Sequence, residues 1–230
     1  MSTAGETIRL TSRADGFVFE AYHVRPTDAR RGGLVLIQEI FGVTDHIREL
    51  ADGFAEDGYE VIAPSFYDRQ QPGFQASYEA ADMQAAVALS QAAPWDLVAS
   101  DAQAAIDALE GPVFVAGYCW GGAAAWLVAC RCDGVAAASC FYGRRISELV
   151  EETPRCPTIL HFGKTDASIP MERIDEIRER HPDLPIYLYD AGHGFFSDRR
   201  KDHQPDAARL ARLRTLQVFT RNGGGRGEGA

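Results

Sequence analysis

The sequence predicts an α/β fold with a mostly parallel central sheet and helices on both faces. Short apolar runs alternate with segments of helical periodicity, and this alternation is typical of parallel sheets. The run 34–37 is wholly apolar, as expected for a strand buried on both faces. Chemically active side chains directly follow the expected strands, at the edge where such sheets build their sites. We therefore expect one domain over residues 1–221 and a glycine-rich, disordered tail over 222–230.

The expected elements follow from local patterns along the chain. Alternating apolar residues in 16–24 indicate an antiparallel strand of the edge type. Apolar residues recur at helical spacing after Asp45, and Gly58 suits the end of that helix. The remaining strands are expected at 34–37, 59–64, 112–116, 135–142, 157–162 and 186–189, and the remaining helices at 77–91, 96–109, 123–129, 171–180 and 206–220.

Composition excludes several classes of protein. The 230 residues carry a formal net charge of −10, which argues against a nucleic-acid-binding surface. No segment approaches the ~20 uncharged apolar residues of a membrane span, and the N-terminus lacks the apolar core of a secretory signal. The five cysteines lack the spacing of a disulfide framework. We expect a cytoplasmic protein with reduced thiols, a monomer or small homo-oligomer, without a metal or cofactor.

The segment Gly117-x-Cys119-x-Gly121 is the most informative stretch. It stands between an expected strand and an expected helix, the context of the nucleophile elbow in the α/β-hydrolase fold. The amide of Trp120 could donate a hydrogen bond to an oxyanion, and the positive end of the helix favours a thiolate. The alternative interpretation is a structural cysteine in an alanine-rich core.

Two further residues complete a catalytic set in the chain order of this fold. Asp166 follows one expected strand and His193 follows the next, so that nucleophile, acid and histidine occur in sequence. His193 would take the thiol proton, and Asp166 would hold the imidazole in the required tautomer. His161 lies inside an expected strand and is interpreted as a core histidine.

These motifs resemble the dienelactone hydrolase family of α/β hydrolases. The combination of a cysteine elbow with Glu39 distinguishes that family from serine esterases in general. The similarity spans about residues 16–220. The matching segments are 38–42, 63–69, 117–122, 141–143, 163–170 and 192–195.

The resemblance implies a triad of Cys119, Asp166 and His193, and it implies a role for Glu39. In the family's proposed mechanism the thiol stays protonated until substrate binds, and the glutamate then takes its proton. A carboxylate near a desolvated site has a raised pKa, which makes it a usable base. By analogy, the backbone amides of Trp120 and Ile40 form the oxyanion hole.

The resemblance also implies a substrate, a dienelactone opened to maleylacetate. This cyclic enol ester bears a carboxylate, which needs a cation. Arg69 matches one of the family's two arginines, but Ser197 occupies the place of the second. Arg199 or Arg144 could substitute for it, and Tyr142 also follows a strand at the same edge.

The sequence therefore predicts an enzyme that cleaves a small-molecule ester or lactone, with a carboxylate on the substrate, through a cysteinyl thioester. The family's name for the activity is carboxymethylenebutenolidase. Two alternatives stay open: a thiol esterase or thioesterase of broader specificity, and a non-catalytic relative in which Cys119 senses oxidation.

Overall fold

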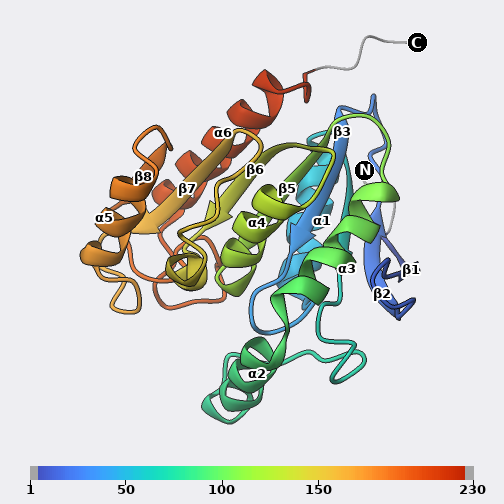
Figure 1. Ribbon diagram of the computed structural model, residues 1–230, viewed down its shortest axis with the longest axis horizontal. Helices are drawn as coiled ribbons and strands as arrows, with labels where there is room; N and C mark the ends of the chain where they lie inside the picture. The colour runs from blue at the N-terminus through green and yellow to red at the C-terminus, as the bar shows by residue number, and fades with distance from the viewer. Residues whose placement is uncertain (1–4, 226–230) are drawn as a thin grey trace.

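An eight-stranded sheet forms the centre of the computed structural model, which describes residues 5–225 (Figure 1). Its strands are β1 (Glu6–Thr11), β2 (Val18–Val24), β3 (Gly32–Ile37), β4 (Tyr59–Pro64), β5 (Val113–Tyr118), β6 (Val135–Phe141), β7 (Thr158–Gly163) and β8 (Ile186–Tyr189). The spatial order is β1-β2-β4-β3-β5-β6-β7-β8. Strands β3 to β8 are parallel, and β2 joins β4 and β1 by antiparallel pairing. The predicted mostly parallel sheet is confirmed.

Helices cover both faces of the sheet (Figure 1). They are α1 (Asp45–Glu56), α2 (Ala80–Ala92), α3 (Trp95–Asp107), α4 (Trp120–Arg131), α5 (Met171–Arg180), α6 (Pro205–Arg221) and a 3₁₀ turn, η1 (Arg144–Glu148). Helices α3 and α4 pack together on one face. On the other face, Arg212 of α6 donates to Asp57 beside α1 at 2.6 Å. Helix α2 stands away from the sheet (Figure 1).

Strands β3 and β5 form the centre of the core because all of their residues are buried. On one side, Phe114 stacks on Phe219 of α6 with ring centroids 4.6 Å apart. On the other side, the fully buried Trp126 of α4 anchors the helix that follows the elbow. Helices α6 and α4 therefore pack on opposite faces of the strands whose ends carry the site. Within residues 5–225, no helix is both long and apolar enough to cross a membrane.

Two elements were not expected from the sequence. Strand β1 is a mostly exposed edge strand in which Leu10 is the one buried residue, so its alternation is weak. The turn η1 follows β6 directly.

The expected disordered tail begins with packed residues, since the Tyr59 hydroxyl donates to the Gly224 carbonyl at 3.3 Å. Residues 226–230 of that tail lie outside the described residues.

His161 is a core histidine, as the sequence predicts. It is fully buried, with Nδ1 2.7 Å from the Tyr189 hydroxyl and Nε2 3.2 Å from Ser139 Oγ. Burial, and then the charge of Arg214, lowers the pKa of His161 to about 3. The unfolded chain protonates this imidazole below its ordinary pKa of about 6.5, whereas the folded chain keeps it neutral. Stability that is present above pH 6.5 is therefore lost as the pH falls toward 3.

We expect His161→Phe to remove part of the acid sensitivity of folding. A histidine kept neutral in the folded state accounts for about 2 kcal/mol of lost stability between pH 7 and pH 5. The variant should be less stable than wild type at pH 7, because Tyr189 and Ser139 lose a partner. Its further loss between pH 7 and pH 5, measured by urea unfolding, should be smaller by about that amount. An equal loss in both proteins would contradict the assignment.

Candidate active site

Cys119 stands at a strained turn between β5 and α4. Its φ of 57° and ψ of −116° lie outside the regions that non-glycine residues favour, at a cost of about 1–3 kcal/mol. The turn is held because the Cys119 amide donates to the Phe141 carbonyl at 3.0 Å. A Cβ on Gly121 would lie only 2.4 Å from the Gln38 carbonyl oxygen. The glycine thus lets α4 begin directly against the end of β3.

Asp166 and His193 meet Cys119 from the loops that follow β7 and β8. His193 Nε2 lies 3.2 Å from Cys119 Sγ, and Nδ1 lies 2.6 Å from Asp166 Oδ2. The Asp166 side chain is fully buried, whereas 19% of the His193 side chain is exposed. The structure therefore brings the three predicted residues into one continuous relay from carboxylate to thiol.

Charge coupling within this relay stabilises a protonated His193. Burial alone would lower its pKa, but the negative charge of a Cys119 thiolate and the hydrogen bond that the ring donates to Asp166 together raise it to about 10. Burial alone would raise the pKa of Asp166, but His193 and Ser168 outweigh burial and lower it. The carboxylate thus stays ionised, and an imidazolium is favoured beside the sulfur.

Tyr142 packs against His193 and does not line the pocket. The sequence had led us to expect a contact with substrate. Its ring is fully buried and packs edge-on against the His193 ring, with centroids 5.1 Å apart. Its φ of 36° turns the chain after β6 so that the ring lies under the imidazole. The strand end predicted this residue's position, but its burial depends on packing.

Glu39 is buried at the end of β3, with 2% of its surface exposed. The Tyr78 hydroxyl donates to Glu39 Oε2 at 3.2 Å. Burial raises the pKa of Glu39, and the positive charge of Arg200 opposes this rise. Among residues 5–225, hydrogen bonds join Glu39 to Tyr78 and Cys119 to His193, but none joins Glu39 to Cys119. In this arrangement the imidazole of His193 is the titratable group that contacts the thiol.

A pocket of about 340 Å³ opens over the sulfur. Cys119 and His193 are both among its lining residues, as are Trp120 and Ile40, the expected oxyanion-hole residues. Trp120 begins α4, so its amide has no acceptor within the helix and is available to a ligand. The remaining walls are an apolar side, with Met83 and Val87 of α2, and a basic side, with Arg144, Arg145 and Arg200.

Two of the expected cations do not reach this pocket. Arg69 forms a bidentate pair with Asp101 of α3, at 2.7 and 2.8 Å, and a further bond to Asp15 at 2.7 Å. Arg199 pairs with both oxygens of Glu49 in α1, at 2.7 and 2.6 Å. The guanidinium donors of each arginine already hold distant segments together. Arg69 and Arg199 thus form ion pairs between distant segments and do not line the pocket, whereas the sequence had led us to expect both to bind substrate.

Arg200, which the sequence did not single out as a site residue, is a cation that lines the pocket. The buried Ser197 accepts a backbone hydrogen bond from Arg200 at 3.1 Å, and this turn directs the arginine toward the site. The guanidinium lies 5.7 Å from the centre of the Tyr78 ring. The one available signal was the basic run 199–201 shortly after His193, which resembles an ordinary solvated turn. Tyr78 had no recognisable signal in the sequence.

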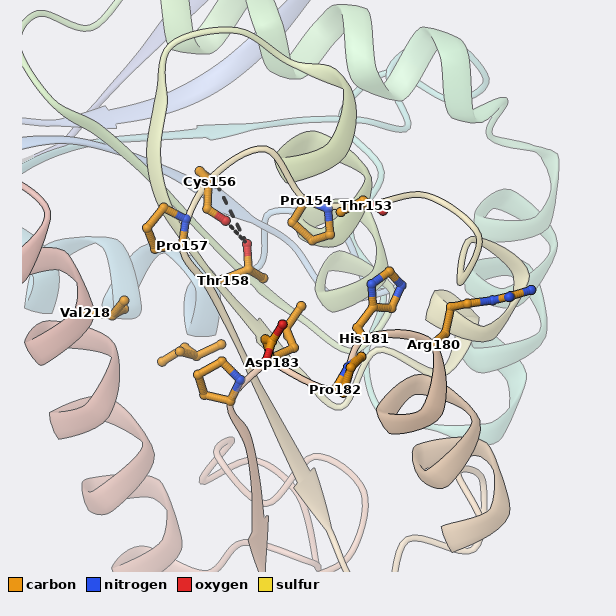
Figure 2. Close-up of a pocket in the computed structure, with 13 residues that line it drawn as sticks. Thr153, Pro154, Cys156, Pro157, Thr158, Arg180, His181, Pro182, Asp183 and Val218 are labelled. Atoms are coloured by element: carbon orange, nitrogen blue, oxygen red, sulfur yellow. Dashed lines mark hydrogen bonds between the residues drawn. The ribbon is translucent and has the colours of Figure 1, made fainter.

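A second hollow, of about 540 Å³, lies at the opposite ends of β7 and β8 (Figure 2). It contains a thiol, Cys156, whose pKa is raised by burial. Figure 2 shows Cys156 beside Thr158, with His181 on the far side of the hollow. His181 Nε2 is already bound to the Val150 carbonyl at 2.7 Å. This hollow lacks a paired nucleophile and base among its lining residues, so the pocket over Cys119 is the candidate active site.

Comparisons with known proteins find relatives with similar sequences and a similar fold. The sequence model of the "Dienelactone hydrolase family" matches residues 19–223. A carboxymethylenebutenolidase of Pseudomonas putida is 32% identical over 218 residues, covering 89% of this chain and 92% of the relative. A Synechocystis protein provisionally named carboxymethylenebutenolidase is 32% identical over 210 residues, covering 81% of this chain and 84% of the relative. A Klebsiella pneumoniae crystal structure, provisionally named a dienelactone hydrolase, has a TM-score of 0.82 and 26% identity, covering 95% of this chain and 100% of its own.

Proposed function

This chain belongs to the dienelactone hydrolase family and is an ester or lactone hydrolase of the α/β-hydrolase fold, and we propose that it works through a thioester formed on Cys119. The observation that carries the proposal is the relay from Asp166 through His193 to Cys119 at the floor of the pocket. A thiol next to a base that is itself oriented by a carboxylate is the arrangement that activates a nucleophile.

In the proposed reaction, His193 takes the thiol proton of Cys119, the sulfur attacks the carbonyl carbon, and the carbonyl oxygen becomes an oxyanion. The amides of Trp120 and Ile40 donate hydrogen bonds to that oxygen. Collapse of the tetrahedral intermediate breaks the carbon–oxygen bond, and His193 gives a proton to the leaving oxygen. The acid product is released when water, deprotonated by His193, attacks the thioester and the sulfur departs. An enolate leaving group eases the first collapse, because it is less basic than an alkoxide.

Glu39 is proposed to take part in proton transfer from the Cys119 thiol. Its raised pKa makes it an alternative acceptor of the thiol proton, in which case the leaving oxygen takes its proton from a His193 that is already protonated. Because Cys119 Sγ lies against His193, direct transfer to Glu39 requires the Cys119 side chain to rotate away from the imidazole. The Tyr78 hydrogen bond and the nearby Arg200 charge favour the ionised carboxylate, which is the form that accepts a proton.

We propose that the substrate bears a carboxylate and that the basic wall of the pocket binds it. Arg144 and Arg200 both line the pocket, and no ion pair of either is found within residues 5–225. Arg145 is already engaged, since its Nε donates to Glu148 at 2.8 Å. The substrate class that fits is an enol lactone of the dienelactone type, with its carboxylate toward the arginines and its apolar face toward Met83.

Arg200→Gln should reduce the preference for a charged substrate. We expect kcat/KM for a carboxylate-bearing dienelactone to fall about 10- to 100-fold, as for loss of a hydrogen bond to a charged group. The value for its uncharged methyl ester should change much less. Arg199→Gln is the matched control and should leave both values near wild type, because Arg199 pairs with Glu49 outside the pocket.

Steady-state hydrolysis of the two esters by the three proteins decides this point. If wild type cleaves both esters equally well and Arg200→Gln affects both alike, the pocket does not recognise charge. The activity would then be that of a thiol esterase of broader specificity.

A further inference from the structure

Ser168 contacts both the acid and the base of the relay. It lies in the loop after β7, two residues beyond Asp166, and it lines the pocket over Cys119. Its hydroxyl donates to Asp166 Oδ1 at 2.6 Å, and its backbone amide donates to the same oxygen at 2.8 Å. Ser168 Oγ also lies 3.1 Å from His193 Nδ1.

We propose that Ser168 is a positioning residue, which orients the Asp166 carboxylate and selects the reactive tautomer of His193. The inference rests on the proposed function, because it assigns to Ser168 a part in the proton transfer between His193 and Cys119.

The first part of the argument concerns the carboxylate. Asp166 is fully buried, and an ionised carboxylate without water needs other donors. Oδ2 accepts the ring proton of His193, and Oδ1 accepts the amide and the hydroxyl of Ser168. Both oxygens are thus held, and the carboxylate cannot rotate without breaking a short bond. Ser168 is one of the groups that lower the pKa of Asp166 against the effect of burial.

The second part concerns the imidazole. The Ser168 hydroxyl proton points toward Asp166 Oδ1, so the oxygen presents a lone pair to His193 Nδ1. Nδ1 therefore faces two acceptors, Asp166 Oδ2 at 2.6 Å and Ser168 Oγ at 3.1 Å. A proton on Nδ1 satisfies this environment. Nε2 of neutral His193 is then left with its lone pair toward Cys119 Sγ, which is the tautomer needed to accept the thiol proton.

A purely structural role of Ser168 would depend on its backbone. The amide bond to Asp166 Oδ1 survives replacement of the hydroxyl, and so does the bond from the Ile169 amide to the Asp166 carbonyl at 3.1 Å. The turn therefore does not need the hydroxyl, whereas the carboxylate and the imidazole both contact it. Removal of the hydroxyl alone therefore distinguishes a structural role of the Ser168 backbone from a positioning role of its side chain.

Four other titratable groups face His193, and a substitution at Ser168 alters the chemical identity of none of them. They are Cys119 at the start of α4, Asp166 after β7, Glu39 after β3 and Tyr142 after β6. A change in the titration of His193 in a Ser168 variant thus reports loss of the hydroxyl and its effect on Asp166.

The experiment compares wild type with Ser168→Ala, Ser168→Thr and the control Ser147→Ala. Ser147 lies in η1, and its hydroxyl contacts the Arg144 carbonyl at 3.4 Å. Ser168→Ala should lower kcat on an activated ester about tenfold, with KM within about twofold of wild type. NMR titration of the His193 ring should show its midpoint about one pH unit lower, since the imidazolium loses support. Ser168→Thr should restore most of the rate and the midpoint, and Ser147→Ala should match wild type.

Two results would overturn the proposal. One is a Ser168→Ala variant with the wild-type kcat and the wild-type His193 midpoint. The other is equal impairment of Ser168→Thr and Ser168→Ala, because the hydroxyl would then be irrelevant. A wild type that hydrolyses no ester would overturn the proposed function instead, and the NMR titration would still decide whether Ser168 supports the Asp166–His193 pair.

Discussion

Replacement of His193 by alanine is expected to lower kcat/KM for an activated ester by at least about 10³-fold, with the fold retained. The imidazole lies 3.2 Å from Cys119 Sγ, and in the proposed reaction it takes the thiol proton and protonates the leaving oxygen. Because 19% of its side chain is exposed and it lies in a loop, its removal leaves the core intact. Urea unfolding of the variant should show a folded protein at pH 7 that is less stable than wild type, because the buried Asp166 Oδ2 loses its donor.

Cys119→Ala should be about as inactive, and the double variant should be no worse than either single one, because the two side chains act as one unit. His23→Ala, which removes a histidine paired with Glu60 at the edge of the sheet, is the control and should keep kcat/KM. Rapid acid quench of wild type should trap an acyl group on the peptide that contains Cys119. If turnover survives in His193→Ala, the relay is not the catalytic machinery. If wild type shows no turnover but Cys119 oxidises independently of Asp166, the thiol-sensor alternative is correct.

Gly121→Ala should prevent folding or destabilise the chain by about 3 kcal/mol or more. Local propensity predicts the reverse, since alanine favours a helix over glycine by about 1 kcal/mol. Close packing decides whether Gly121→Ala raises or lowers the free energy of unfolding. A Cβ at Gly121 would lie 2.4 Å from the Gln38 carbonyl oxygen and 2.6 Å from that of Ile37, and neither backbone atom can move without displacing β3. The measurement is the yield of soluble protein and its free energy of unfolding.

Gly53→Ala in α1 is the matched control, because it is also a helical glycine. A Cβ there would meet only the Arg212 guanidinium, at 3.5 Å, an ordinary contact. That variant should be more stable than wild type by up to about 1 kcal/mol. If both glycine variants are equally stable, α4 does not approach β3 closely enough to exclude a Cβ at Gly121.

Some elements could be predicted closely from local patterns. Strand β4 and helix α5 begin and end at the expected residues, because an apolar run and a helical periodicity each depend on a few consecutive positions. The short exposed strand β1 was not predicted, since an edge strand with one buried residue has little pattern to recognise. The loop positions of Cys119, Asp166 and His193 followed from chain order, and the structure brings them together.

The cations of the pocket could not be predicted in the same way. Arg69 and Arg199 were expected at the pocket, but the partners that hold them elsewhere are distant in sequence. Asp101 lies 32 positions from Arg69, and Glu49 lies 150 positions from Arg199. Arg200 adjoins Arg199 in the chain, yet it turns toward the pocket. An arginine side chain is long and flexible, so only the surrounding structure determines where its charge lies.

The sequence by itself determined the fold class and the chain order of Cys119, Asp166 and His193, because these depend on local periodicity and on glycines at a tight turn, and its motifs carried the resemblance to the family. Only the tertiary structure decided which arginines line the pocket, that Tyr142 lies beneath His193, and that Ser168 joins Asp166 and His193. The physical reason is that hydrogen bonds and ion pairs act over about 3 Å between side chains from separate loops, and only the folded sheet brings those loops together.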